Sequence, residues 1–534
     1  NNNADILIGE LNTRFSNSAN NKLQIGFTQL RDFRSSLSAG NFPQVDILDG
    51  NGLPYTTFGY ERFTYGNVLN SDVIQVNDIF NLYKGKHEFT FGTQNSFKQY
   101  SNGFSPSYAG AFRFNSLADF YASANGTKAA AVYDLSYSLS GGFPLVGPKN
   151  TELSLFAQDK FRVKDNLTIT YGIRADYVSF ADNFLFNPVV DTLSRFYGGT
   201  RLNTGLAPKA SLQISPRVGF NWDVKDDKTT QIRGGLGIFS GRVPYVWLSN
   251  QLSNNGVLFG SEAISNPTNR PFTVNVDAYR PAVSTSIIPT SYNLAVTDPN
   301  FKFSQVFRAN LAVDKSLGDG WLVSLEGIYT KDINAVYLEN VNLPDSKVKA
   351  VGSDSRVIYY TLGTNGLPSS TKNNQIYGGT RGLNAPTTGN TGLNPNISDA
   401  IVIKNTQLGY SYALTATVSK AFDNGLFASL SYTNSDSRSV NDGGSIAQSQ
   451  WRDRVVSGDP NENVASYSSY MQAHRINAYG SYKLNYLSEK AATTFGFTYS
   501  VAPAGRFSYT YSGDMNGDGQ TANDLMYIPR GEGE

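Results

Sequence analysis

The chain of 534 residues contains no cysteine and only two histidines, His87 and His474. The lack of cysteine excludes disulfide frameworks, thiolate zinc sites and cysteine nucleophiles, and two distant histidines argue against a histidine-rich metal centre. Charged residues make up only 16% of the chain, with a net charge of +1. This argues against nucleic acid as a partner, because nucleic-acid-binding proteins carry a basic excess or patch.

Long hydrophobic runs are also missing. No apolar segment reaches the roughly 18 residues that a membrane helix needs, so helical membrane spans are excluded. Membrane β-barrels remain compatible with the composition, because their apolar residues alternate with polar ones and leave no long run.

What the chain has in abundance is an alternation of apolar and polar residues with a period of two. In residues 168–177 (TITYGIRADY), isoleucine, tyrosine and alanine fall on one face, and threonine, glycine, arginine and aspartate on the other. This period predicts a β-strand with one apolar and one polar face. The pattern recurs around Ile25, Val76, Phe220, Leu236, Leu311, Leu325, Leu414, Leu430 and Phe497.

Tight polar turns join these predicted strands in pairs. Looser turns lie near residues 17–21 and 487–490, and the others are of the Asp/Asn/Gly type that favours β-hairpins. These others are 84–86 (KGK), 164–166 (KDN), 225–227 (KDD), 318–320 (GDG) and 423–425 (DNG). We therefore predict an all-β fold of roughly seven hairpins, or about 14 strands.

Between the hairpins, the connections are long and rich in Asn, Ser, Thr, Gly and Pro. Short and long connections alternate strictly, so every long loop leaves the same end of the sheet. This is the topology of an outer-membrane β-barrel, with short turns in the periplasm and long loops outside the cell. The predicted loops are residues 34–70, 101–150, 181–214, 241–300, 331–404, 435–470 and 503–534.

A large soluble β-sandwich or propeller is the alternative. Its strands would alternate too, but its loops would be short on both sides and its buried face would favour Val, Ile and Leu over Tyr. The chain has 32 Tyr and no visible propeller-like repeat of about 40–50 residues, which favours the barrel.

The cost of burying charge indicates which face meets lipid. A lipid-facing Arg or Lys near the bilayer midplane costs roughly 2–4 kcal/mol, so the charged face is predicted to line the lumen and the aromatic-rich face to contact outer-membrane lipid. Asp78 and Asp159 interrupt the apolar face, and we expect them near a rim or beside a bulge. The predicted lumenal charges are Arg174, Asp176, Arg217, Asp223, Arg233, Arg308, Asp314, Glu326 and Lys483.

Three segments, in the same order, resemble the barrel of TonB-dependent outer-membrane transporters, especially the Oar-like group of Bacteroidota. The first contains LFAQDKFRV and DNLTITYGIR (155–174), which resemble the "QD-x-aromatic" and "NLT-x-x-x-G-x-R" strands of that family. The second contains SPRVGF and IRGGLGIF (215–239), and the third contains DMNGDG, NDL and YIP (514–529). The resemblance implies a transmembrane antiparallel barrel of about 22 strands that holds a plug. We expect the plug, its TonB box and the remaining strands to lie outside this chain.

Residues 514–525 match the first half of an EF-hand calcium loop. Oxygen-bearing side chains occupy positions one, three and five, a glycine permits the sharp turn at position six, and position seven offers its carbonyl. Leu525 replaces the glutamate of position twelve, with an aspartate one place earlier. The alternative is a tight turn held by its own hydrogen bonds. The predicted structural calcium site comprises Asp514, Asn516, Asp518, Gln520 and Asp524.

No catalytic set is recognisable. His87 and His474 each begin a predicted strand, and neither lies beside a nucleophile motif. We therefore predict that the protein is not an enzyme and that it requires no cofactor. Any calcium bound in the loop after residue 513 would be structural.

By the resemblance, the chain is expected to act as the barrel of a TonB-dependent receptor in the outer membrane. Its loops would capture an extracellular ligand, and the TonB complex would act through the plug to drive uptake. The alternative is a non-transporting barrel that serves as a scaffold or surface protein and holds other envelope proteins. The sequence does not identify the substrate.

Overall fold

The computed structural model describes residues 2–531 except 37–40, 182–183, 243, 283–290, 379–394, 444–445 and 489. Parts of all the predicted loops except 101–150 lie outside the described residues, as does Glu489 in the last predicted turn. The described part is dominated by β-strands, and none of its helices is long and apolar enough to cross a membrane.

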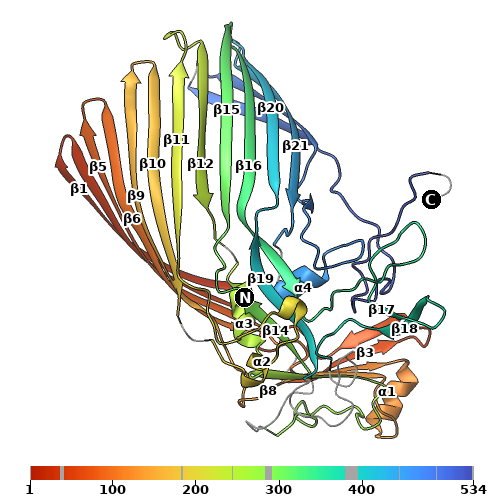
Figure 1. Ribbon diagram of the computed structural model, residues 1–534. Coiled ribbons are helices and arrows are strands. Elements are labelled where there is room, and N and C mark those ends of the chain that lie inside the picture. Colours follow the sequence, from red (N-terminus) through yellow and green to blue (C-terminus); the bar gives the residue numbers. More distant parts are fainter. Residues whose placement is uncertain are drawn as a thin grey trace.

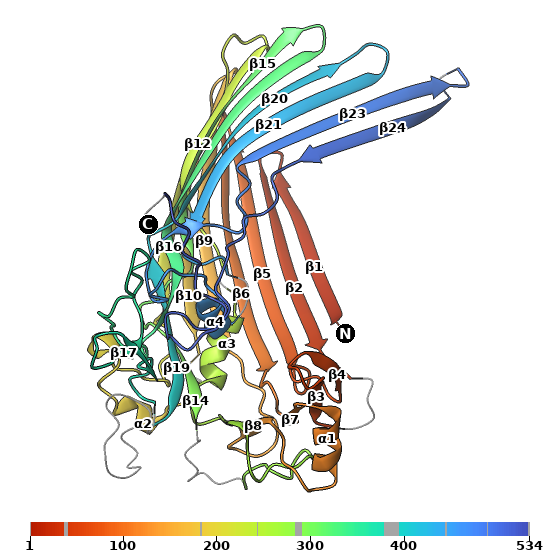
Figure 2. The same cartoon turned by 90° about the vertical axis from the view of Figure 1, so that its right-hand side faces the viewer.

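A curved antiparallel wall forms most of the molecule (Figures 1 and 2). Its strands follow one another in chain order, each paired with its neighbours, as the alternating sequence predicts. The prediction of about 14 strands is confirmed. They are β1 (Asn2–Ser16), β2 (Ala19–Phe33), β5 (Val68–Lys84), β6 (His87–Gly103), β9 (Lys149–Lys164), β10 (Leu167–Phe180), β11 (Ser211–Asp223), β12 (Thr230–Ser240), β15 (Gln305–Gly318), β16 (Trp321–Asn340), β20 (Tyr410–Ala421), β21 (Leu426–Ser439), β23 (His474–Tyr486) and β24 (Ala491–Val501).

The short turns lie together at one end of the wall, and the long connections gather at the other (Figure 1). Glycines permit the tightest turns: Gly85 joins β5 to β6 with a φ of 61°, and Gly320 joins β15 to β16 with a φ of 76°. A side chain at Gly320 would collide with the carbonyl oxygen of Ala421, because its Cβ would lie only 2.0 Å away. Among the described residues, no pairing joins β24 to β1.

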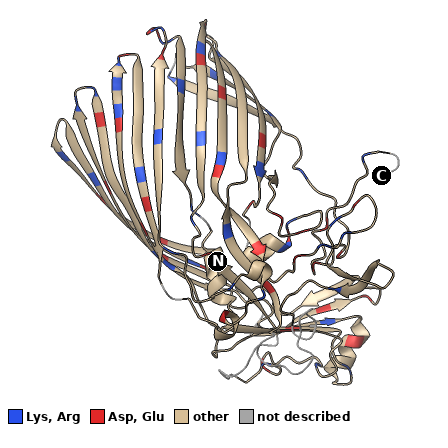
Figure 3. Ribbon diagram, in the orientation of Figure 1, with Lys and Arg blue, Asp and Glu red and all other residues tan. Residues whose placement is uncertain are grey.

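The two faces of the wall differ in chemistry as predicted. Along β21, the side chains of Leu426, Leu430 and Tyr432 are exposed, and the residues that alternate with them, such as Ser431, are less exposed. Paired residues of an antiparallel sheet point to the same side, and Leu430 pairs with Val418 and Ala478, so the apolar face continues across the neighbouring strands. Lys, Arg, Asp and Glu are spaced along several wall strands (Figure 3).

Two aspartates depart from this pattern. Asp78 pairs regularly with Leu23 and Thr93 in the interior of β5, so the expectation of a rim or bulge is wrong for this residue. Its carboxylate accepts a 2.7 Å hydrogen bond from the Asn21 amide. Asp159 is 3% exposed and lies 2.7 Å from His87 Nδ1 and 2.7 Å from the Tyr171 hydroxyl. Hydrogen bonds from polar neighbours on the same face therefore offset the cost of placing these two carboxylates on the apolar face.

The described parts of the predicted loops contain strands and helices that the sequence patterns do not reveal. One part is a five-stranded sheet in the order β13-β8-β7-β3-β4, flanked by helix α1. Its apolar core includes Val45, Phe112, Phe114, Tyr133 and Leu135. The bounds are β3 (Gln44–Leu48), β4 (Pro54–Phe58), β7 (Ala111–Phe114), α1 (Leu117–Ala124), β8 (Val132–Ser138) and β13 (Phe259–Ser265).

A second part extends the wall beyond its predicted end. β16 continues to Asn340 and pairs there with β19, which occupies the end of predicted loop 331–404. Val336, Leu338, Ile401 and Ile403 bury this extension in an apolar cluster, which explains why the strand does not stop near residue 330. The remaining elements are α2 (Pro188–Asp191), η1 (Tyr197–Gly199), α3 (Val246–Ser253), β14 (Tyr292–Thr297), β17 (Tyr360–Leu362), β18 (Pro368–Lys372), β19 (Ile397–Thr406), α4 (Ala447–Arg452) and β22 (Ser466–Tyr467).

Candidate functional site in the barrel lumen

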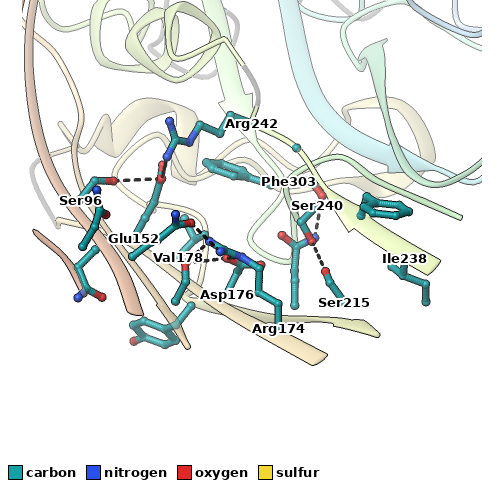
Figure 4. Close-up of a pocket in the computed structure, with 18 of the residues that line it drawn as sticks. Ser96, Glu152, Arg174, Asp176, Val178, Ser215, Ile238, Ser240, Arg242 and Phe303 are labelled. Carbon is teal, nitrogen blue, oxygen red and sulfur yellow. Dashed lines mark hydrogen bonds and ion pairs between the residues drawn. The ribbon is translucent and has the colours of Figure 1, made fainter. Parts of the chain in front are cut away.

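A cavity of about 360 Å³ lies on the polar face of the wall, where the wall meets the long loops. Strands β5, β6 and β9 to β12 supply most of its lining, and the connection between β12 and β15 contributes Arg242 and Phe303 (Figure 4). Gln213 on β11 links the two parts, because its amide donates a 2.8 Å hydrogen bond to the Phe303 carbonyl. The cavity therefore has a rigid sheet on one side and a loop on the other.

Arg174 and Asp176 lie at the centre of the wall side of this cavity. They are two residues apart on β10, so they share a face, and Arg174 Nε donates to Asp176 at 2.7 Å. The other guanidinium nitrogens of Arg174 donate to Gln94 on β6 and Ser154 on β9, each at 2.7 Å. The network ties three neighbouring strands together and holds the guanidinium in place.

A second charged group lies where the loop contacts the wall. Glu152 on β9 is 2.5 Å from Lys98 Nζ and 3.1 Å from an Arg242 guanidinium nitrogen. Tyr245 and Ser96 also donate hydrogen bonds to this carboxylate. The side chains of Lys98 and Glu152 are 4% and 11% exposed, whereas that of Arg242 is 61% exposed. Arg242 is therefore the partner that is accessible to another molecule.

The other predicted lumenal charges form separate contacts along the same face. Arg233 binds Asp314 at 3.0 Å and Glu326 at 3.2 Å across β12, β15 and β16. Arg217 lines the cavity and donates to Gln158 at 2.9 Å, and Arg308 donates to Thr330 at 3.1 Å. The predicted charges thus share the inner face, but only Arg174, Asp176 and Arg217 line the cavity.

Sequence reasoning did not find the Lys98–Glu152–Arg242 group. Glu152 continues the polar alternation of β9, so its face was readable from the sequence. Its partners were not, because Lys98 lies 54 residues away and Arg242 on a loop that only the tertiary fold brings near.

The predicted calcium-binding segment is a compact loop in which backbone N–H groups hold the carboxylates. Asp514 accepts from the N–H of Gly517 at 2.6 Å and of Gly519 at 2.9 Å, and Lys372 Nζ lies 2.5 Å from the same carboxylate. Asp518 accepts from the Gln520 N–H at 2.7 Å. Its burial raises the pKa of the Asp518 carboxyl to about 6.

Asp524 and Asn516, two more of the predicted ligands, also have protein partners. Asp524 accepts from the Met515 N–H at 2.8 Å and from buried Arg356 at 3.2 Å. Asn516 is fully buried and donates to Asp518 at 3.0 Å. Among the described residues, no group of three or more His, Asp or Glu side chains converges as metal ligands. The five predicted residues lie in one loop, and the hydrogen bonds within it match the self-bonded turn that was the alternative. Calcium binding stays a prediction.

The amino-acid sequence matches a known family over most of its length. Residues 2–502 match the family described as outer membrane beta barrel domain. The chain belongs to this family. Its wall is therefore the wall of an outer-membrane barrel, with the apolar face toward lipid and the charged face toward the lumen. No curated protein matches the chain.

The barrel domain is also similar to solved outer-membrane transporters. It shares 10% identity with the outer membrane transporter YddB from Escherichia coli, covering 94% of this chain and 55% of that one, at a TM-score of 0.49. It shares 11% identity with the siderophore receptor PirA from Acinetobacter baumannii, covering 93% and 49%, at a TM-score of 0.43. The chain thus spans about half the length of these proteins, and its family membership rests on the sequence match.

Proposed function

We propose that this barrel domain is the wall of a TonB-dependent, Oar-like receptor that takes up an extracellular ligand. The observation that carries the proposal is the polar cavity between the inner face and the long loops. There, charged side chains that are held by hydrogen bonds and ion pairs surround a space of about 360 Å³. A passive wall does not need paired charges arranged on β6, β9, β10 and the adjoining loop around one cavity.

In this proposal, the inner face positions a plug. Arg174 is held by three hydrogen bonds, and Arg242 is held at one end by Glu152 while remaining 61% exposed. Guanidinium groups fixed in this way present donors in a defined direction, which suits docking to carboxylates or backbone carbonyls of a second domain. The TonB complex would then act on the plug, and the extracellular loops would bind the ligand.

A comparison of nutrient use tests the proposal without knowledge of the substrate. Three strains are grown in the same complex medium: the parent, a strain lacking this gene and a strain lacking TonB. Mass spectrometry then identifies the compounds left in each spent medium. We expect the compounds that the gene deletion leaves behind to be among those that the TonB deletion leaves behind.

Two results would contradict the proposal. If the strain without this gene leaves compounds in the medium that the strain without TonB still takes up, uptake is not coupled to TonB. If the strain without this gene takes up the same compounds as the parent and instead releases envelope proteins from the membrane, the non-transporting scaffold is the correct function. Complementation with the intact gene is the control for effects on neighbouring genes.

A further inference from the structure

A second cavity, of about 260 Å³, lies among the loops rather than in the lumen. The small sheet contributes residues of β8 and β13. Helix α3 contributes Asn250, its C-cap is Asn254, and the start of β14 contributes Tyr292 and Asn293. All residues that line it are among the described ones. The cavity therefore lies between the small sheet and the segment formed by α3 and β14.

Three residues of this lining carry buried polar atoms that have no hydrogen-bond partner within the protein. They are Arg62 Nε, Ser107 Oγ and Asn293 Oδ1. Such an atom has lost the hydrogen bonds that water gave it in the unfolded chain, and native proteins keep few of them. The described part of the chain contains eleven such atoms. Three of them belong to residues that line this one small cavity, which is more than an even distribution would place there. A polar molecule in the cavity would restore such hydrogen bonds after modest side-chain rotation.

The backbone at Ser107 is strained as well. Its φ is 59°, in the left-handed region that non-glycine residues seldom adopt. Strain of this kind concentrates at functional positions. It is independent of the missing hydrogen bonds, because it concerns the main chain.

The charges in the cavity are already paired within the protein. Arg62 binds Asp134 at 3.2 Å, and Glu262 binds Arg270 at 2.9 Å. A charged ligand would have to break one of these pairs and leave a partly buried charge without its partner. The cavity therefore suits a neutral ligand.

The other lining groups are amides, hydroxyls and aromatic rings. Two amide contacts are long: Asn254 Nδ2 to Asn250 Oδ1 is 3.5 Å, and Asn293 Nδ2 to Gln448 Oε1 is 3.4 Å. Such weak contacts can be exchanged for better ones with a ligand. The rings of Phe104, Phe259 and Tyr292 supply apolar surface beside these polar groups.

We propose that this cavity binds a neutral sugar residue of an extracellular glycan. A hydroxyl group both donates and accepts, so neighbouring sugar hydroxyls can accept from Arg62 Nε, donate to Asn293 Oδ1 and do either with Ser107 Oγ. The C–H face of a sugar ring packs against the aromatic rings. The volume is just below the roughly 300–1,000 Å³ of sites for drug-sized ligands, which limits the occupant to one or two rings. The inference rests on the proposed function, since it names the class of ligand that the receptor would capture.

Equilibrium binding to the full-length protein in detergent tests this assignment by isothermal titration calorimetry. The probes are neutral hexasaccharides of glucose, xylose or mannose, the anionic hexasaccharide of galacturonic acid, and hexaglycine. We expect at least one neutral saccharide to bind with a Kd in the millimolar range or below. Asn293→Ala and Asn254→Ala should each weaken that binding at least fivefold, and Ala263→Trp, at an exposed edge of the cavity, should abolish it.

Asn275→Ala is the matched control, because Asn275 is an exposed loop asparagine outside the cavity and should bind like the unaltered protein. Preference for hexaglycine or galacturonate, binding that the cavity variants leave unchanged, or no saccharide binding at all would each overturn the inference. Binding in detergent needs no energy coupling. A protein that binds saccharide in this cavity but takes up nutrients independently of TonB would therefore refute the proposed function and leave this inference standing.

Discussion

Placing a single arginine on either face of the wall measures directly which face meets lipid. Leu430 is 49% exposed on the apolar face of β21, and the next residue, Ser431, points to the lumen. β21 begins at Leu426, and four residues at about 3.3 Å each, on a strand tilted by about 40°, place Leu430 about 10 Å above the turn end. The apolar band is about 25 Å tall, so Leu430 lies near its middle.

We expect Leu430→Arg to destabilise the folded barrel by about 2–4 kcal/mol, the cost of an arginine near the bilayer midplane. Ser431→Arg should cost less than about 1 kcal/mol, because its guanidinium reaches the aqueous lumen; it forfeits only the 3.0 Å hydrogen bond with Thr417. Urea titration of the full-length protein in lipid vesicles, followed by heat-modifiable mobility on gels, gives both free energies of unfolding.

The comparison has an internal reference, since the two positions are adjacent in the sequence and receive the same side chain. Equal destabilisation by both variants, or a larger loss for Ser431→Arg, would refute the assignment of the faces. Repeating the titration in vesicles with a thicker bilayer should increase the cost of Leu430→Arg and leave that of Ser431→Arg unchanged.

Two further predictions concern the charged groups. Glu152→Ala should lower the free energy of unfolding by about 3–5 kcal/mol, because it removes the carboxylate beside the Lys98 ammonium, whose side chain is only 4% exposed. The same urea titration should show that adding Lys98→Met recovers much of this loss. If the effects of the two substitutions simply add, the two side chains are not coupled. Burial raises the pKa of Asp518 to about 6, above the roughly 3.9 of an unfolded aspartate. The folded loop therefore binds this proton more tightly than the unfolded chain does. The stability that the proton adds is present at pH 4 and is lost as the pH rises through 6. Protection factors of the amides of residues 514–524, which correct for the faster intrinsic exchange at higher pH, should therefore be larger at pH 5 than at pH 7 without calcium. Calcium at pH 7 should restore the protection, except in Asp518→Asn. No effect of calcium on the unaltered loop would reject the calcium site.

The strands and hairpins were predictable because the information that specifies them is local. Alternation over about ten residues determines a strand with two faces, and a dipeptide such as Asp-Gly determines a hairpin turn. The loop sheet was not predictable, because β3 and β7 are short and pair in parallel across a long separation, Gln44 with Ala111. The extension of β16 was missed for a related reason, since only pairing with the distant β19 makes a strand of residues 335–340.

The candidate site was also predictable only where local sequence specifies it. The sequence alone determined that Arg174 and Asp176 share the polar face, since residues two apart on a strand point the same way. Only the tertiary structure decided that Lys98 and Arg242 meet at Glu152, beside one cavity, and that Arg62, Ser107 and Asn293 line another. The physical reason is that a strand's periodicity is a property of neighbouring residues. The partner of a buried charge or amide depends on how the whole chain packs.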